Sequence, residues 1–243
     1  MPEKRKTQLV VALDIQDAQS AIDLAEKLKN MPVVLKIGWV LYPLIGQNGL
    51  IEIAEMFKGR IFLDFKLHDI PSVIAKGVGS LMMTVPFQIL TLHTSGGHEM
   101  LRQSVEMRDK TFKEGSKCFE KPILLGVTVL TSMSADILSQ VGSRFQTPEE
   151  AVVALAGLAK NSGLDGIVSS VHEAPVLRKT FGDNFILLTP GIRPSGSPAE
   201  DQARTATPSE AKAMGSDFIV VGRPIIKAEN PIAVVEQILH ELE

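Results

Sequence analysis

Ile61-Phe62-Leu63-Asp64-Phe65-Lys66 is an apolar run that ends in charged residues, and it leads into Leu67-His68-Asp69-Ile70-Pro71. Side chains alternate between the two faces of a β-strand, so Asp64 and Lys66 are expected on one face and Phe65 on the other. Desolvating a carboxylate and an ammonium costs several kcal/mol per ion, roughly, so burial alone does not explain this pair. Both a structural ion pair at a strand end and a functional site do explain it.

Similar short apolar runs recur along the whole chain. They cover residues 9–13, 33–37, 61–63, 88–93, 123–129, 166–169, 186–188 and 218–221. Their nearly continuous apolar character is typical of parallel strands that are buried on both faces. Eight strands alternating with helices predict an α/β fold, a (β/α)8 TIM barrel that forms a single domain over residues 1–243. A doubly wound open sheet is the alternative topology, although no GxGxxG follows the first run.

Helix start signals lie between several of these runs. Thr147-Pro148-Glu149-Glu150 and Thr207-Pro208-Ser209-Glu210 each combine an N-cap threonine, a proline at the first helical position and a glutamate at the third. Asn230-Pro231 predicts the start of the last helix, and Gly163 and Gly215 follow the expected ends of the first two. These signals support the alternation of strands and helices.

Composition limits the classes of function. The formal net charge is −3 over 243 residues, which argues against broad binding to nucleic acid or to an anionic membrane. Cys118 is the only cysteine, so neither an intrachain disulfide nor a cysteine zinc cluster is expected. The polar start has no apolar signal-peptide core, and no apolar run approaches the ~18 residues of a membrane helix. We therefore expect a soluble protein of the cytoplasm.

Polar or charged residues stand at the ends of most of the predicted strands or shortly after them, whereas the rest of each strand is apolar. These residues are Asp14, Lys36, Asp64, Lys66, His93, Thr131, Arg193 and Arg223, and Gly222 precedes the last of them. The active sites of (β/α)8 barrels lie at the carboxyl ends of the strands. So many polar strand ends favour a concave, charged site over an isolated structural ion pair.

Gly222-Arg223 has the chemistry of a phosphate site. Glycine lets a backbone N–H approach an oxyanion closely, and a guanidinium binds phosphate through two donors. Barrels often bind phosphate near strands seven and eight. A surface arginine that caps a helix is the alternative for Arg223. The nearby residues 194–202 are rich in Gly, Ser and Pro, which fits either a lid or a passive linker.

The nearby histidines and aromatic residues carry less information. His68 and His93 lie close to Asp64, but their spacing matches no metal motif, so no metal site is predicted. Trp39 and Tyr42, which follow the second run, are expected to pack rather than to contact a ligand.

Three motifs together resemble one family. They are Asp64-x-Lys66-x-x-Asp69-Ile70-Pro71, Thr189-Pro190-Gly191-Ile192-Arg193-Pro194 and Val221-Gly222-Arg223-Pro224. With Val11-Ala12-Leu13-Asp14 at the start, the chain resembles the orotidine 5′-phosphate decarboxylase family of the bacterial type over almost its whole length. The resemblance implies a (β/α)8 barrel. It also implies cofactor-free conversion of orotidine 5′-monophosphate to uridine 5′-monophosphate and CO₂ in de novo pyrimidine biosynthesis.

The resemblance also implies residue roles. Lys36, Asp64, Lys66 and Asp69 match the family's alternating charged array, in which the lysine matched by Lys66 donates a proton. The matching substrate-binding positions are Asp14 and Lys36 for the ribose, Arg223 and the Gly222 backbone for the phosphate, Gln202 from the loop, Arg193 nearby, and Thr131. In the family the second aspartate, Asp69 here, reaches into the neighbouring subunit's site. A homodimer with shared active sites is therefore implied.

One position departs from the family pattern, which usually reads Asp-Ile-Pro-Asn-Thr. The chain has Asp69-Ile70-Pro71-Ser72-Val73, and Val73 cannot supply the usual hydroxyl hydrogen bond. Such a bond typically contributes roughly 0.5–1.5 kcal/mol. The departure therefore puts one substrate contact in doubt, not the reaction.

Three alternative functions differ from this one. Metal-dependent relatives, 3-keto-gulonate-phosphate decarboxylase and hexulose-phosphate synthase, share the Asp-x-Lys-x-x-Asp signature but place a glutamate on the second strand as a magnesium ligand. Lys36 stands there in this chain, and an ammonium cannot coordinate Mg²⁺, which prefers oxygen donors. A non-catalytic nucleotide-binding barrel is the second alternative. A purely structural barrel is the third, and it leaves the charged strand ends unexplained.

Overall fold

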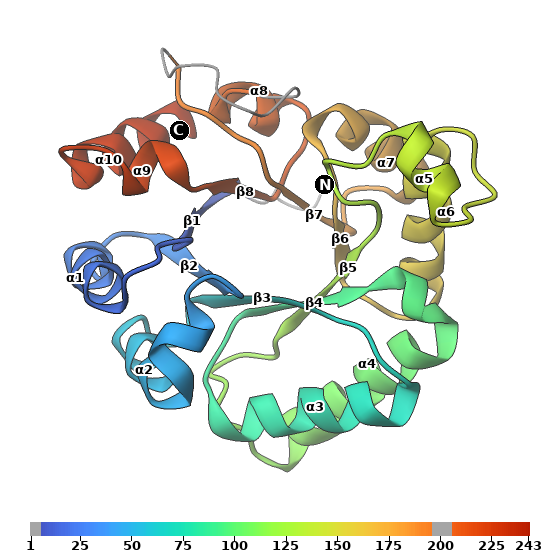
Figure 1. Cartoon of the computed structure of the whole chain (residues 1–243), viewed down its shortest axis with the longest axis horizontal. Helices are drawn as coiled ribbons and strands as arrows, with labels where there is room; N and C mark the ends of the chain where they lie inside the picture. The colour runs from blue at the N-terminus through green and yellow to red at the C-terminus, as the bar shows by residue number, and fades with distance from the viewer. Residues whose placement is uncertain (1–5, 196–205) are drawn as a thin grey trace.

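Eight parallel strands close into a barrel in their order along the chain, with β8 paired to β1 (Figure 1). The computed structural model describes residues 6–195 and 206–243. The strands are β1 Gln8–Ala12, β2 Val33–Gly38, β3 Ile61–Leu67, β4 Ile89–His93, β5 Ile123–Val127, β6 Gly166–Val168, β7 Ile186–Thr189 and β8 Phe218–Val221. Every predicted run overlaps one of them. The predicted (β/α)8 barrel is therefore confirmed, and the doubly wound alternative is wrong.

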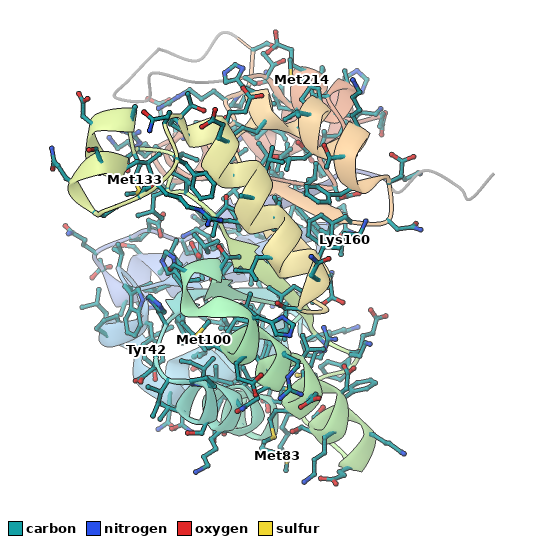
Figure 2. The ribbon with its side chains drawn as sticks, turned by 90° about the vertical axis from the view of Figure 1, so that its right-hand side faces the viewer. Tyr42, Met83, Met100, Met133, Lys160 and Met214 are labelled. Carbon is teal, nitrogen blue, oxygen red and sulfur yellow. The ribbon has the colours of Figure 1, made fainter. Side chains whose placement is uncertain are left out.

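Helices surround the strands in a ring (Figure 1). They are α1 Ala18–Leu28, α2 Tyr42–Met56, α3 Pro71–Thr84, α4 Gly97–Glu114, α5 Ala135–Gln140, α6 Pro148–Asn161, α7 Ala174–Phe181, α8 Pro208–Ala213, α9 Arg223–Ile226 and α10 Pro231–Glu241. Figure 2 shows the molecule from the side, with α4 (Met100) and α6 (Lys160) facing the viewer. Within the described residues, no helix is both long enough and apolar enough to cross a membrane.

The predicted helix boundaries agree with the structure. Thr147 and Thr207 cap α6 and α8 through their side chains, and Asn230 caps α10. Gly163 and Gly215 follow α6 and α8 with φ of 85° and 97°, a left-handed conformation that favours glycine. These helices therefore begin and end where short-range sequence signals place them.

The core has two layers because strand side chains alternate between the barrel interior and the helices. The inward layer contains Val10, Ala12, Val34, Phe62, Ile89, Leu125, Ile186, Leu188, Phe218 and Val220. The next inward positions toward the carboxyl ends of β2, β3 and β4 are Lys36, Asp64 and Thr91. The interior thus changes from apolar to polar where the site begins.

Two strand boundaries differ from the sequence prediction by two or more residues, whereas the others agree to within one residue. β3 continues to Leu67 instead of ending at Leu63, and β5 ends at Val127 rather than at 129. β3 is longer because its charged residues stay in the sheet, where the pairing with β4 resumes at Leu67 after an irregularity. The charged segment is therefore part of the rigid barrel.

Candidate active site

A cavity of about 570 Å³ opens at the carboxyl ends of the strands. Its lining comes mainly from the ends of β1, β2, β3, β7 and β8 and from the residues that follow them. It includes seven of the residues predicted from the sequence, namely Asp14, Lys36, Asp64, Lys66, Arg193, Gly222 and Arg223. The closed barrel brings them together from positions up to about 200 residues apart in the chain, as expected for this end of the fold.

Asp14, Lys36, Asp64 and Lys66 form a chain of alternating charges, called here the Asp/Lys array. Lys36 Nζ lies 2.9 Å from Asp14 Oδ1 and 3.5 Å from Asp64 Oδ2. Lys66 Nζ lies 2.8 Å from Asp64 Oδ1. Asp64 thus has one ammonium on each carboxylate oxygen. The array can stabilise negative charge that develops beside Lys66, and Lys66 can supply a proton.

Burial strengthens these interactions because water screens them poorly inside the barrel. The side chains of Lys36 and Asp64 are only 10% and 13% exposed, whereas Lys66 is 35% exposed at the cavity wall. Removing one partner of a buried ion pair typically costs about 3–5 kcal/mol, since the other charge is left unpaired. The array is therefore a rigid, mutually dependent unit.

The backbone at Lys66 is not that of a regular strand. Residues 64–66 of β3 lie opposite the single residue Thr91 of β4, and the φ of Lys66 is 49°. A non-glycine residue in such a conformation costs on the order of 1–3 kcal/mol. Asp64 and Lys66 do share one side of the strand, as predicted. However, this bulge, rather than a regular pleat, determines how their side chains meet.

Phe65 points away from Asp64 and Lys66, as predicted, and packs against Trp39 and Tyr42. Its ring centroid lies 5.3 Å from that of Trp39 and 5.1 Å from that of Tyr42. Trp39 Nε1 also donates a hydrogen bond to the Phe65 carbonyl oxygen at 3.1 Å. The expected packing of both aromatic residues is confirmed. Trp39 is nevertheless largely exposed and lines the cavity, which the sequence interpretation did not anticipate.

The ends of β7 and β8 form a basic part of the cavity, called here the anion end and defined by Arg193, Gly222 and Arg223. Arg193 is 9% exposed, and its Nε has no hydrogen-bond acceptor among the described residues. Buried polar groups are normally satisfied, so an anion in the cavity is a suitable partner. Gly191 has a φ of 83°, which lets the chain turn between β7 and Arg193.

Three predicted site residues are not placed in the cavity. Asp69 is exposed beyond β3, where its Oδ1 accepts a hydrogen bond from the Ile70 N–H at 2.6 Å. Thr131 is exposed in the turn after β5 and is not among the residues that line the cavity. Gln202 lies outside the described residues. The roles of these three residues therefore stay predictions.

His93 ends β4 beside the Asp/Lys array, and its ring centroid lies 5.6 Å from that of His68. Burial lowers the pKa of His93 below its ordinary value of 6.5; nearby His68 and Lys66 lower it further, and Asp64 partly offsets them. His93 is therefore neutral near pH 7. Among the described residues, no cluster of three or more His, Cys, Asp or Glu could bind a metal ion.

Sequence reasoning missed several residues at this site. Val40, Pro190, Ile192 and Ile226 line the cavity as apolar wall residues, and Thr91 lies beneath the Asp/Lys array. Pro190 and Ile192 belong to the motif at residues 189–194 but were given no role, whereas Val40 and Ile226 carry no distinctive signal, since apolar residues are common next to strands. Thr91 did carry a signal, because it is a polar residue between the apolar residues Leu90 and Leu92 of a buried strand.

Comparisons with known proteins give one consistent result. The model of the family described as orotidine 5′-phosphate decarboxylase / HUMPS matches residues 7–238. A protein of Gluconobacter oxydans named orotidine 5′-phosphate decarboxylase is 42% identical over 238 residues and covers 98% of each chain. One of the same name from Pseudoalteromonas translucida is 39% identical over 243 residues, or 100% of each chain. The crystal structure of orotidine 5′-phosphate decarboxylase from Lactobacillus acidophilus superposes with a TM-score of 0.85 at 34% identity, covering 98% of this chain and 99% of that one.

Proposed function

Given that the chain belongs to the orotidine 5′-phosphate decarboxylase / HUMPS family and is a carboxy-lyase of pyrimidine biosynthesis, we propose that Lys66 is its proton donor. The observation that supports this proposal is the continuous Asp14–Lys36–Asp64–Lys66 array on the wall of the cavity. The Lys36–Asp64 pair at its centre is buried, and stability alone does not readily explain such a pair, because buried ion pairs are weak evidence for stability.

The charge distribution of the cavity orients orotidine 5′-monophosphate. Its phosphate lies at the anion end, where Arg223, Arg193 and the Gly222 N–H supply donors. The ribose hydroxyls contact Asp14 and Lys36, and the pyrimidine ring then faces Lys66. In this orientation the scissile C6–carboxylate bond lies beside the Asp/Lys array.

The chemical step requires one proton and no redox partner. Cleavage of the C6–carboxylate bond releases CO₂ and leaves an electron pair at C6. Lys66 Nζ donates a proton to that carbon, which gives uridine 5′-monophosphate and a neutral amine that solvent reprotonates. Asp64, whose Oδ1 lies 2.8 Å from Lys66 Nζ, holds the ammonium in place before the reaction.

Proton donation alone is too small an effect. General acid catalysis contributes about 10²–10⁴-fold, whereas enzymes lower barriers by roughly 8–23 kcal/mol. Two opposite charges about 4 Å apart interact by about 4 kcal/mol at an effective dielectric constant of about 20. Preorganised charges in the Asp/Lys array therefore supply much of the remaining stabilisation, as in other electrostatic sites. Repulsion between Asp64 and the substrate carboxylate adds to this effect and disappears as CO₂ leaves.

A second chain completes the site in this proposal. Asp69 lies outside its own cavity, and Ile70 and Val73 next to it are 62% and 46% exposed. Exposed apolar side chains beside a carboxylate are suited to a protein interface. We therefore propose a homodimer in which Asp69 enters the partner's cavity and faces Lys66 there. Val73 cannot supply the hydroxyl hydrogen bond that is usual at its position.

The reaction in this proposal uses no metal. Lys36 stands between Asp14 and Asp64, so an ammonium already neutralises the carboxylates that a cation would need. Thr131 and Gln202, which lies outside the described residues, are proposed as further substrate contacts. The proposed location is the cytoplasm, which suits a chain whose single cysteine, Cys118, is buried and unpaired.

The test follows the ultraviolet absorbance of orotidine 5′-monophosphate in the presence of a chelator and without added cofactor. We expect Lys66→Ala to lower turnover by more than the roughly 10²–10⁴-fold of general acid catalysis, because it also breaks the array. Lys179→Ala, which removes an exposed lysine of α7, should retain native turnover. Native turnover by Lys66→Ala would refute the role of Lys66. Loss of native activity in chelator would refute the metal-free reaction.

A further inference from the structure

We propose that Thr91 is a positioning residue that sets the geometry of Lys66 and Asp64 through its hydroxyl group. This inference rests on the proposed function of Lys66 and extends it to a residue that touches no substrate. Thr91 lies on β4, faces the barrel interior and is completely buried. No part of its side chain reaches the cavity surface, so any effect on catalysis must pass through the residues it contacts.

The Thr91 hydroxyl joins the backbone of Lys66 to the side chain of Asp64. Its Oγ1 accepts a hydrogen bond from the Lys66 N–H at 3.0 Å. The same oxygen lies 3.1 Å from Asp64 Oδ1 and 3.5 Å from the Leu63 carbonyl oxygen. A hydroxyl has one proton to donate, and the shorter distance assigns that proton to Asp64. Thr91 therefore acts as acceptor for one catalytic residue and donor to the other.

These contacts close a ring that includes both ends of Lys66. The Lys66 N–H donates to Thr91 Oγ1, Thr91 donates to Asp64 Oδ1, and that same oxygen accepts from Lys66 Nζ at 2.8 Å. The Thr91 hydroxyl thus fixes both the backbone of Lys66, where its side chain begins, and, through Asp64, the position of its ammonium. A displacement of either the Asp64 carboxylate or the Lys66 backbone would therefore move the Lys66 ammonium.

The bulge in β3 explains why a side chain is needed at this point. Residues 64–66 lie opposite Thr91 alone, and Lys66 has a left-handed φ of 49°. In a regular parallel ladder the Lys66 N–H would donate to a backbone carbonyl of the neighbouring strand. Here the Thr91 hydroxyl takes the place of that carbonyl. A buried N–H without a partner is unfavourable, so the hydroxyl stabilises the unusual backbone conformation.

Thr94, which directly follows the same strand, provides a matched control. It is also completely buried, and its Oγ1 donates to the Val127 carbonyl oxygen at 2.8 Å. Neither Asp64 nor Lys66 is its partner in that hydrogen bond. Thr91→Val and Thr94→Val each remove one buried hydroxyl while keeping the shape of the side chain. Only Thr91→Val removes contacts with Asp64 and Lys66, so comparing the two separates a general loss of stability from a displacement of these two residues.

The experiment compares the native chain, Thr91→Val, Thr91→Ser and Thr94→Val in kcat, KM, uridine 5′-monophosphate binding and Tm. A small displacement of a catalytic group can cost about 10²-fold, so we expect Thr91→Val to lower kcat by about 10- to 100-fold. KM and product binding should stay native, because only the chemical step depends on the position of Lys66. Thr91→Ser should recover most of kcat. Thr94→Val should lower Tm but keep native kcat.

Native kcat in Thr91→Val would overturn the inference, and so would an equal loss of kcat in Thr94→Val at an equal loss of Tm. Including Lys66→Ala in the same series shows whether a negative result refutes only the role of Thr91 or also the proton-donor role of Lys66. If Lys66→Ala is inactive while Thr91→Val is fully active, only the role of Thr91 is refuted. If Lys66→Ala turns over at the native rate, the proton-donor role is refuted, and the positioning role of Thr91 with it.

Discussion

At the scale of single residues, the two arginines of the anion end differ in their surroundings. Arg193 is almost completely buried and is attached to the chain ahead of α8, because its backbone N–H donates to the Ala206 carbonyl oxygen at 2.9 Å. Arg223 begins α9 and is half-buried at the cavity wall. Arg223 is therefore the better residue to substitute, since its side chain is less buried than that of Arg193.

We predict that Arg223→Ala weakens binding of uridine 5′-monophosphate. A hydrogen bond to a charged group contributes about 1.5–3 kcal/mol, which corresponds to roughly ten- to hundred-fold in Kd. Isothermal titration calorimetry with uridine 5′-monophosphate and with uridine checks this prediction, because uridine lacks the phosphate and should bind both chains equally. Lys227→Ala, at an exposed position nearby, is the control variant. If both ligands lose the same affinity, the phosphate binds elsewhere.

At the scale of elements, helix termini are determined locally. The Thr207 side chain accepts a hydrogen bond from the Glu210 N–H, and Glu210 accepts one from the Thr207 N–H. The hydrogen bond from the Thr207 backbone N–H to the Glu210 carboxylate, followed by the interaction of that carboxylate with the Thr207 side chain, lowers the pKa of Glu210 below its ordinary value of 4.5. Since the folded-state pKa is lowered, the contribution of Glu210 to stability is present above about pH 4.5 and is lost as the pH falls.

We predict that Thr207→Ala lowers the free energy of unfolding by about 0.5–2 kcal/mol, as loss of an N-cap does in other helices. Urea denaturation at pH 7 measures this change. The same substitution at Thr180, an exposed residue inside α7, should leave stability unchanged or raise it slightly, because alanine has the higher helix propensity. Equal losses from both substitutions would show that the cap contributes nothing.

At the scale of the whole molecule, the proposed homodimer makes a distinctive prediction. Lys66→Ala and Asp69→Ala should each be nearly inactive, but a mixture of the two chains should recover activity. Half of the randomly formed dimers are hybrids, and each hybrid has one intact site out of two. The expected recovery is therefore about a quarter of native activity for an isologous dimer.

A second mixture serves as the control for this experiment. Asp64 and Lys66 belong to the same cavity, so chains carrying Asp64→Ala and Lys66→Ala cannot form an intact site together. Size-exclusion chromatography of two differently tagged chains establishes whether hybrids form. If hybrids of Lys66→Ala and Asp69→Ala form but stay inactive, Asp69 does not act across the interface.

Local patterns in the sequence determined the eight strands, several helix ends and the polar strand ends that line the cavity. Local patterns are enough to locate these features, because apolar strand runs and helix caps involve residues that are close in the chain. The alternation of strands and helices is common to a closed barrel and a doubly wound sheet, so the pairing of β8 with β1 in the structure decided the closure. The extent of the domain over all of residues 1–243 stays a prediction, since the structure describes 6–195 and 206–243.

Only the tertiary structure decided how the site is assembled. The Lys36–Asp14 and Lys36–Asp64 distances, the bulge opposite Thr91 and the left-handed backbone of Lys66 depend on the register between neighbouring strands. Register results from packing across the whole barrel, so no local pattern specifies it. For the same reason, the sequence indicated that Asp64 and Lys66 share one side of β3, but it could not show that a buried threonine from β4 holds them there.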